Sequence, residues 1–293
     1  MRWRGIVEIL LSGFCFGFLG LFGKIAYSQG ISSGEFLSFR FLLSASLLAC
    51  FFLFFQWKKF LLTWQSIMHC GLLGIFGYAV FSSCFFRALQ GLSASLTVLL
   101  LYTYPVFVLL GSRFLFKEEL PLYKWLALPL QFIGLLMLVG LDISSVDIIS
   151  LLFGLGSAFF YALYILASSK LLKGVSPWSS VFYIQFFAAI ALSLIYFDNI
   201  NRVKEVFFHS YPVLIGTAVI GTLMAMSLFL SALQKLKSYE ASILSTAEPL
   251  TGIVLAMVFL REHLSLPQLM GAILILGAMI IVSWKKTIKA KIV

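Results

Sequence analysis

Arg87-Ala88-Leu89-Gln90-Gly91-Leu92 returns 144 residues further along the chain as Ser231-Ala232-Leu233-Gln234-Lys235-Leu236. Other short pieces repeat at the same spacing: Gly30-Ile31-Ser32 with Gly174-Val175-Ser176, Gly77 with Gly221, Ser83 with Ser227, and Pro105 with Pro249. A weak similarity that recurs at one fixed spacing indicates a duplicated structural unit. We therefore predict two repeats, covering residues 1–144 and 145–293.

The composition places both repeats in a membrane. The chain has 293 residues, of which 61% are hydrophobic and 11% are charged. A soluble domain carries about 25% charged residues, so no soluble core could bury this much apolar surface, and the lipid bilayer must be the solvent. The formal charge of +10 comes from basic residues between apolar segments, where they report orientation. We therefore expect no nucleic-acid partner.

Ten segments are long enough to cross the bilayer. A spanning helix needs about 20 mostly apolar residues. The ten segments cover residues 5–27, 34–56, 67–89, 93–115, 121–140, 148–171, 177–197, 210–233, 240–260 and 265–284. Short loops join them, and the longest, about 198–209, is too short for a soluble domain. The predicted fold class is an all-α integral membrane protein with ten transmembrane helices.

Each repeat contains five of these segments. Because five is odd, the second repeat enters the membrane in the opposite direction to the first. The sequence therefore predicts two inverted five-helix repeats, related by a pseudo-twofold axis in the membrane plane. Secondary transporters built in this way bind their substrates near the midplane, between the repeats.

The basic residues predict the orientation. If the N-terminus lies in the cytoplasm, 15 of the 21 basic residues lie on the cytoplasmic side. These are Arg2, Arg4, Lys58, Lys59, Arg113, Lys117, Lys124, Lys170, Lys173, Lys235, Lys237, Lys285, Lys286, Lys289 and Lys291. The other six, toward the far side, are Lys24, Arg40, Arg87, Arg202, Lys204 and Arg261. Loops rich in Lys and Arg stay in the cytoplasm, so we expect both termini there, in a multi-pass protein of the inner (plasma) membrane.

Glu248 is the strongest candidate for a functional residue. It lies in the middle of segment 240–260, directly before Pro249, where a carboxylate costs ~3 kcal/mol on insertion scales. It should therefore face protein or a water-filled cavity. The residues that share its helical stripe are Ser242, Ser245, Gly252 and Ala256. Glu248 either contacts a proton or substrate, or makes a structural hydrogen bond between helices.

Arg40 is a second charged residue within a spanning segment, about one and a half turns into residues 34–56. Its long side chain could reach the outer interface. Alternatively, its guanidinium could bind a substrate carboxylate or phosphate. Both interpretations stay open at this point.

Tyrosines share helical stripes with small or polar residues in three segments. They are Tyr78 with Ser82, Tyr161 with Tyr164, and Tyr102 and Tyr104 beside Pro105. A tyrosine in a spanning segment needs a partner for its hydroxyl. A cavity walled by these rings would suit an amphipathic or cationic organic solute through stacking and cation–π contact. Packing between helices is the alternative role for each ring.

Motifs of enzymes are missing. The three histidines are dispersed, and the sequence contains no HExxH pair and no phosphate-binding GxxxxGK[ST] loop. We therefore expect no enzyme activity, no metal site and no cofactor.

The ten-helix duplicated plan resembles the drug/metabolite transporter superfamily, and within it the EamA-type transporters. The pieces that carry the resemblance are Phe39-Arg40-Phe41-Leu42-Leu43, Ala88-Leu89-Gln90, Tyr104-Pro105-Val106-Phe107 followed by Lys117-Glu118, and Glu248-Pro249-Leu250 followed by Arg261-Glu262. The resemblance implies a carrier of small metabolites or drugs with a central cavity between helices 1, 3, 4, 6, 8 and 9. On that analogy Glu248, Tyr104, Tyr78, Tyr161 and Ser227 would line the cavity.

The predicted function is secondary active transport of a small organic metabolite, such as an amino acid or a related amphipathic or cationic solute, by alternating access. Export and exchange both fit, as do coupling to protons or to a counter-substrate, and a monomer or a homodimer. Pro105 and Pro249 are the candidate hinges, because a proline removes one helical hydrogen bond. A membrane-embedded lipid-modifying enzyme and a channel or flippase are the alternatives.

Overall fold

The computed structural model describes residues 2–118, 122–140, 147–197, 200–260 and 265–283. Within these residues all of the regular secondary structure is helical, and no strand is present. The helices of the first half are α1 (Arg2–Ser28), α2 (Ser33–Phe55), η1 (Trp57–Phe60), α3 (Trp64–Leu72), η2 (Leu73–Ala79), α4 (Val80–Ala88), α5 (Ala94–Leu101), α6 (Tyr104–Phe114) and α7 (Leu122–Val139). Those of the second half are α8 (Ile148–Leu171), α9 (Pro177–Tyr196), α10 (Ile200–Ala218), η3 (Val219–Met224), α11 (Ala225–Leu233), α12 (Ser238–Leu244), α13 (Ala247–Leu260) and α14 (Leu266–Ser283).

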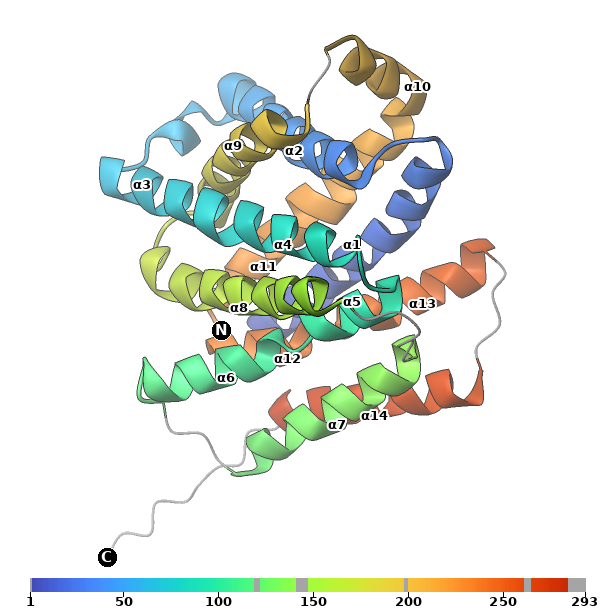
Figure 1. Cartoon of the computed structure of the whole chain (residues 1–293). Coiled ribbons are helices and arrows are strands. Elements are labelled where there is room, and N and C mark those ends of the chain that lie inside the picture. The colour runs from blue at the N-terminus through green and yellow to red at the C-terminus, as the bar shows by residue number, and fades with distance from the viewer. Residues whose placement is uncertain (1, 119–121, 141–146, 198–199, 261–264, 284–293) are drawn as a thin grey trace, which may run out of the picture.

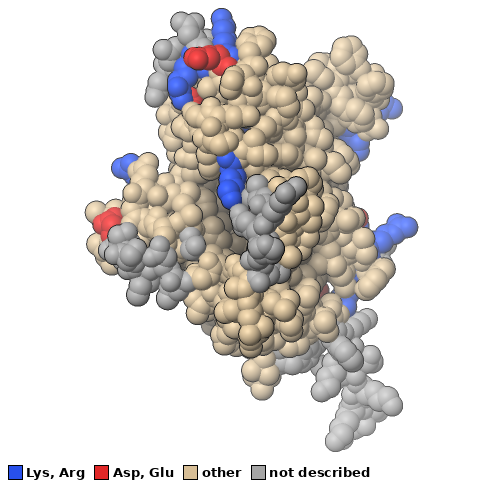
Figure 2. Space-filling view, turned by 90° about the vertical axis from the view of Figure 1, so that its right-hand side faces the viewer, with Lys and Arg blue, Asp and Glu red and all other residues tan. Residues whose placement is uncertain are grey.

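The protein is an all-α membrane protein. Nine helical stretches of the described residues are long and apolar enough to cross a bilayer, and a tenth, Lys124–Val139 in α7, is apolar but shorter. Large apolar side chains cover the outside of the bundle, and Leu194 is 82% exposed. In water this surface would be costly, whereas lipid tails solvate it. Figure 2 shows one end of the bundle, where uncharged side chains cover most of the surface and the few charges lie mainly toward the rim.

The 144-residue spacing reappears in the helix boundaries. It relates α7 to α14 at both ends, and the gap between α5 and α6 to the gap between α12 and α13. It also relates the two π-helical segments, η2 around Gly77 and η3 around Gly221. Equivalent helices run in opposite directions: α1 runs from left to right in Figure 1, and α8 from right to left. The two halves therefore share one backbone plan in inverted orientation.

The alternating helix directions give the bundle two ends. We call the end at which α1 begins and α14 ends the N-side, and the opposite end the far side (Figure 1). The backbone carbonyl of Ser283, at the end of α14, accepts a hydrogen bond of 3.0 Å from Arg2 at the start of α1. Arg2 and Ser283 therefore lie together on the N-side.

Glycines on α1 bring this helix close to α13. A Cβ atom added to Gly13 would lie 2.9 Å from the Cβ of Ala247, and one added to Gly17 would lie 2.6 Å from the Cβ of Thr251. Small residues allow such close approach of membrane helices. Gly20 has no neighbour within 4 Å of an added Cβ, so it does not belong to this contact.

The pair α7 and α14 packs along one flank of the bundle, where the two helices lie side by side (Figure 1). Gly134 of α7 and Gly271 of α14 face each other so closely that a Cβ on Gly134 would lie 2.7 Å from the Gly271 carbonyl oxygen. Both helices are absent from the cavity described below.

Three predicted helices are wrong in detail. Segments 93–115 and 240–260 are each two helices, interrupted at Tyr102-Thr103 and at Ser245-Thr246, so the stripe from Ser242 to Ala256 is not continuous. The segment predicted at 210–233 begins earlier, because Ile200–Ala218 is helical apart from a kink at Ser210, two residues before Pro212. Proline clashes with the preceding turn, which accounts for the kink. Arg261, Glu262 and the basic residues from Lys285 onward lie outside the described residues.

A candidate substrate cavity between the two halves

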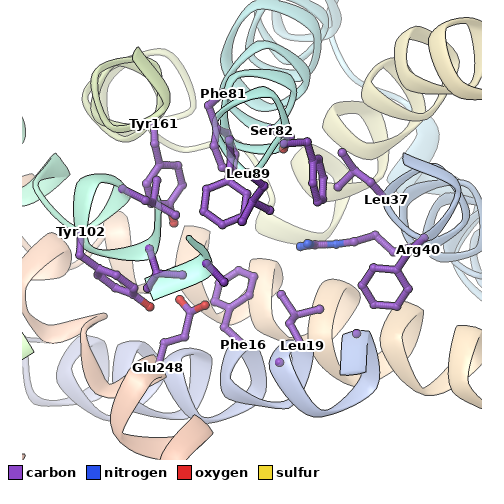
Figure 3. A pocket seen from close by; sticks show the side chains of 18 of the residues that line it. Phe16, Leu19, Leu37, Arg40, Phe81, Ser82, Leu89, Tyr102, Tyr161 and Glu248 are labelled. Atoms are coloured by element: carbon purple, nitrogen blue, oxygen red, sulfur yellow. The ribbon is translucent and has the colours of Figure 1, made fainter. Parts of the chain in front are cut away.

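A cavity of about 400 Å³ is lined mainly by the first half and is completed by Tyr161 and Glu248 of the second half; its volume lies within the range of ~300–1,000 Å³ typical of ligand pockets. Residues from α1, α2, α4 to α6, α8 and α13, together with the π segment η2, surround it. The members that enter the argument below are Gly20, Arg40, Tyr78, Phe81, Ser82, Tyr102, Tyr104, Tyr161 and Glu248. Figure 3 shows Arg40 and Glu248 entering the cavity from opposite walls, with aromatic rings between them.

The interruption of the first half lines the cavity through Tyr102, and that of the second half lies directly behind it. Backbone groups freed within a membrane must find partners in the protein. The Tyr104 hydroxyl lies 3.0 Å from the Ser242 carbonyl oxygen, to which it donates, and 2.6 Å from the Ser245 hydroxyl. The Ser245 carbonyl accepts a bond of 3.1 Å from the Glu248 backbone N–H. The two bonds of Tyr104 connect the first half to the second half at the level of the interruptions.

Glu248 occupies the first turn of α13, beside Gly13 and Gly17 of α1. The N-terminus of a helix carries unpaired N–H groups and a partial positive charge, which favour a carboxylate. The Glu248 side chain points into the cavity (Figure 3), where the Tyr102 hydroxyl lies within hydrogen-bonding reach. This placement provides a carboxylate that a solute can reach from within the protein.

Arg40 turns inward from α2. The residue is 9% exposed; its Nε donates a 3.1 Å hydrogen bond to the Thr222 hydroxyl, and its guanidinium lies 4.8 Å from the Phe41 ring centre. The Nη2 atom is buried and has no hydrogen-bond partner. The hypothesis that this side chain reaches the outer interface is therefore wrong, because Thr222 fixes its guanidinium inside the bundle.

A wall of aromatic rings runs along the cavity. The Tyr78 and Phe81 ring centres are 4.7 Å apart, those of Phe81 and Tyr161 are 4.8 Å apart, and those of Tyr161 and Tyr104 are 4.7 Å apart. Tyr164 packs edge-on against Tyr78 at 5.2 Å. The Phe81–Tyr161 pair is tilted, and the other three pairs are edge-to-face, an arrangement in which aromatic rings stabilise each other.

The structure brings most of the predicted site residues together. Those that line the cavity are Arg40, Tyr78, Ser82, Tyr102, Tyr104, Tyr161 and Glu248. Tyr164 and Ser245 lie behind it, in contact with Tyr78 and Tyr104 respectively. Ser227 is buried in α11 and does not line this cavity. The expectation that helix 8 contributes to the lining is wrong for the described residues: none from α10, η3 or α11 lines this cavity. Helix 2 lines it through Arg40, and Thr222 of η3 lies behind Arg40 and bonds to it.

Thr222 and Phe81 are the main residues that sequence analysis missed. Thr222 positions Arg40, and Phe81 connects Tyr78 to Tyr161. The spacing of 144 residues that relates the two halves pairs Thr222 with Tyr78. That equivalence was the one signal that could have identified Thr222.

The cavity extends toward the far side, while charged side chains pack together on the N-side. Lining residues reach Tyr27 near the end of α1, Phe36 near the start of α2 and Leu89 just beyond α4, all of which lie on the far side. On the N-side, Lys124 contacts Glu240 at 2.7 Å and the Tyr239 hydroxyl at 2.8 Å.

Arg2 also reaches Glu240, at 3.1 Å, and we call Arg2, Lys124, Tyr239 and Glu240 the N-side network. Two further pairs accompany it on this side, Lys235 with Glu8 at 2.6 Å and Lys237 with Glu118 at 3.9 Å. Burial raises the pKa of the Glu118 carboxyl, and Lys237 opposes that shift. The N-side network connects α1, α7 and α12 across the end of the bundle opposite the cavity.

The EamA-like transporter family matches residues 3–140 and 148–284. A transporter of Archaeoglobus fulgidus without a characterized substrate is 33% identical over 217 residues, covering 72% of this chain and 76% of its own. The inner membrane transporter YicL of Salmonella typhimurium is 25% identical over 96% of this chain and 95% of its own.

The threonine/homoserine exporter RhtA of Escherichia coli K12 is 27% identical over 71% of this chain and 67% of its own. A solved crystal structure with 16% identity superposes with a TM-score of 0.78 and covers 96% of both chains, which shows a shared fold. Relatives of this kind are transporters and not enzymes. This chain belongs to the EamA-like transporter family.

Proposed function

We propose that this transporter moves a small organic metabolite, such as an amino acid or a related amphipathic or cationic solute, by alternating access. The observation that carries the proposal is the cavity between the inverted halves, which holds a charged wall at Glu248 and an aromatic wall from Tyr78 to Tyr161. Inverted repeats place substrate sites at this position. The name of RhtA, an exporter of two amino acids, supports the substrate class.

The proposed location is the inner (plasma) membrane, with both termini in the cytoplasm. The bias of Lys and Arg toward the N-side supports this orientation, and the name of YicL supports the membrane. In this orientation the N-side is cytoplasmic, and the cavity reaches the outer side. The chain is then in an outward-facing state, closed on the cytoplasmic side by the N-side network.

Transport requires a second state in which the cavity reaches the cytoplasm. Inverted halves can exchange the two states by rocking, because each half can adopt the conformation of the other. We place the bending points at the interruptions just before Pro105 and Pro249, where i→i−3 backbone hydrogen bonds replace the regular helical i→i−4 pattern. Bending there exposes no new backbone to lipid, since both interruptions face the protein interior.

The proposal leaves two choices to experiment: whether transport is coupled to protons or to a counter-substrate, and whether the protein is a monomer or a homodimer. Glu248 could exchange its proton for substrate, or a counter-substrate could return through the same cavity. The flank formed by α7 and α14 carries exposed apolar side chains such as Leu126 and Ile273. Either lipid, for a monomer, or a second copy, for a homodimer, would cover this flank.

Counterflow in proteoliposomes tests the proposal. Vesicles loaded with one unlabelled metabolite from a panel of amino acids and organic cations receive a trace of the same labelled compound outside. A carrier accumulates label transiently and saturates, because exchange is faster than net movement. Uptake that rises linearly with concentration and shows no stimulation from the opposite side would indicate a channel or flippase and contradict the proposal. Liposomes without protein are the control.

A further inference from the structure

The unpartnered nitrogen of Arg40 indicates the chemistry of the substrate. A buried guanidinium requires hydrogen-bond acceptors, because leaving a charged donor unpaired in a low-dielectric site is costly. Arg40 uses Nε for Thr222 and has the Tyr78 hydroxyl within hydrogen-bonding reach, both of them neutral groups, whereas Nη2 is buried without a partner. In the described part of the chain, no carboxylate forms an ion pair with Arg40. The guanidinium enters the cavity (Figure 3), so the acceptor that is missing from the protein can come from a solute.

Glu248 forms the opposite pole of the same cavity. Its carboxylate enters from α13 while Arg40 enters from α2 (Figure 3). The Tyr102 hydroxyl lies within its reach and the Arg40 guanidinium attracts the carboxylate across the cavity, while no Lys or Arg of the described residues forms a salt bridge with it. The cavity therefore contains one group that seeks an anion and one group that seeks a cation.

We propose that Arg40 binds a carboxylate and Glu248 an ammonium group of the same molecule, so that the substrate is a zwitterion such as a free α-amino acid. This inference rests on the proposed transport function and narrows its substrate class. A zwitterion pairs both charges and leaves the cavity neutral. A simple cation would leave Arg40 unpaired, and a simple anion would leave Glu248 unpaired, which penalises both in a site of low dielectric.

The aromatic wall provides a surface against which the uncharged part of the substrate can pack. Phe81 and Tyr161 line the same cavity as the two charged side chains (Figure 3), and Tyr78 packs against Phe81 in that lining. Their rings offer apolar surface to the side chain of the substrate. The electron-rich ring faces also attract a positively charged ammonium group. Gly20 of α1 also lines the cavity. It leaves space there for the substrate, because no atom lies within 4 Å of the position that a Cβ would take.

The experiment compares three forms of one ligand on purified protein. The twenty standard L-amino acids are screened by thermal shift. For each one that raises Tm, the Kd is measured by calorimetry together with the Kd of its carboxamide, which lacks the carboxylate, and of its N-acetyl derivative, which lacks the ammonium. We expect the amino acid to bind at least about tenfold more tightly than either derivative, as one charged hydrogen bond predicts.

Variants assign each charge to its residue. Arg40→Gln should weaken the amino acid to the affinity of its carboxamide and leave the carboxamide unchanged. Glu248→Gln should weaken the amino acid to the affinity of the N-acetyl form and leave that form unchanged. Arg87→Gln and Glu205→Gln, on exposed far-side residues, are matched controls that should change neither. If a variant fails to fold, the three-ligand comparison on the native chain still decides.

Two results would overturn the proposal: no standard amino acid that binds, or a carboxamide that binds as tightly as its amino acid. The outcome of the counterflow assay separates this failure from failure of the proposed function. Saturable exchange of an organic cation such as ethidium, without binding of any amino acid, would leave the transporter in place and exclude the zwitterion. Absence of exchange for every compound in the panel would contradict transport itself.

Discussion

The two halves of this transporter share a backbone and differ in the side chains at and around the cavity. The interruption before Tyr104 in the first half corresponds to the interruption before Glu248 in the second, and Gly17 on α1 corresponds to Tyr161 on α8. One half thus supplies a hydroxyl where the other supplies an acid, and a close helix contact where the other supplies a ring. Duplication therefore fixed the frame, and divergence of side chains made the cavity asymmetric.

The two ends of the molecule differ for the same reason. Glu240 and Lys124 of the N-side network correspond, at the spacing of the repeat, to Leu96 and Gln268 on the far side. Gln268, in the first turn of α14, bonds to Ser265 just before that helix, and Leu96 carries no charge. At these two positions the described far-side residues form no ion pair, and the far-side pair of Arg202 with Glu35 connects α10 to α2 instead, which agrees with a cavity that reaches the far side.

The largest effect is expected where the equivalent residues differ in charge. Glu248→Gln should reduce transport in the counterflow assay by about 10- to 100-fold, as the loss of a charged hydrogen bond predicts. Tyr104→Phe, its counterpart in the other half, removes only neutral bonds to Ser242 and Ser245 and should cost less. Gel filtration of both variants checks folding. Equal rates for native protein and Glu248→Gln would show that the acid is structural.

Glu240→Gln should make the N-side of the bundle open more easily, because it breaks the ion pair with Lys124. Lys124 and Glu240 side chains are each 7% exposed, and removal of one partner of a buried ion pair costs about 3–5 kcal/mol in soluble proteins. Part of that cost disappears if the N-side opens and hydrates Lys124, so the variant should favour the inward-facing state.

A cysteine reporter measures this opening. Ala241 is fully buried on α12, so Ala241→Cys, in a background without Cys15, Cys50, Cys70 and Cys84, should react slowly with a thiol reagent. We expect labelling to accelerate about tenfold when Glu240→Gln is added, and to stay unchanged with Gln268→Ala on the far side. Unchanged labelling in both would show that the N-side network does not control access.

A third test exchanges glycines on α1. A Cβ at position 17 would lie 2.6 Å from Thr251 and 3.0 Å from the Glu248 carbonyl oxygen. Gly17→Ala must therefore displace α13, at a cost of about 1–3 kcal/mol for overpacking, with a lower Tm and slower transport. Gly20→Ala, one turn further along the same helix, meets open space and should leave Tm nearly unchanged. Equal losses of Tm would contradict the close α1–α13 contact.

The smallest effect on stability is expected at the prolines. Pro105 and Pro249 lie in the first turns of α6 and α13, where the N–H that proline lacks has no helical partner in any case. Pro105→Ala and Pro249→Ala should change the free energy of unfolding by less than about 1 kcal/mol and leave transport within about threefold. A tenfold loss of transport with unchanged Tm would place the bending points at the prolines themselves.

Much of the fold followed from the sequence because the signals act along the chain. Apolar segments of spanning length have one stable environment. The repeat matched Gly77 to Gly221, but the sequence did not predict that both lie in π-helical segments. Glu248 was identifiable because a carboxylate within a spanning segment needs a polar environment. Segment ends were wrong at Ile200 and at the two interruptions, where proline chemistry and neighbouring helices decide jointly.

The sequence by itself determined the membrane environment, the duplication, and the need for a polar place around Glu248, because hydropathy and repetition are properties of the chain alone. Only the tertiary structure decided that Arg40 turns inward to Thr222, that Gly13 and Gly17 make a helix contact while Gly20 faces a cavity, and that Ser227 lies apart. It also brought Arg2, Lys124 and Glu240 together on the N-side. Each of these depends on which helices meet in space, and residues far apart in the chain carry no local signal of that meeting.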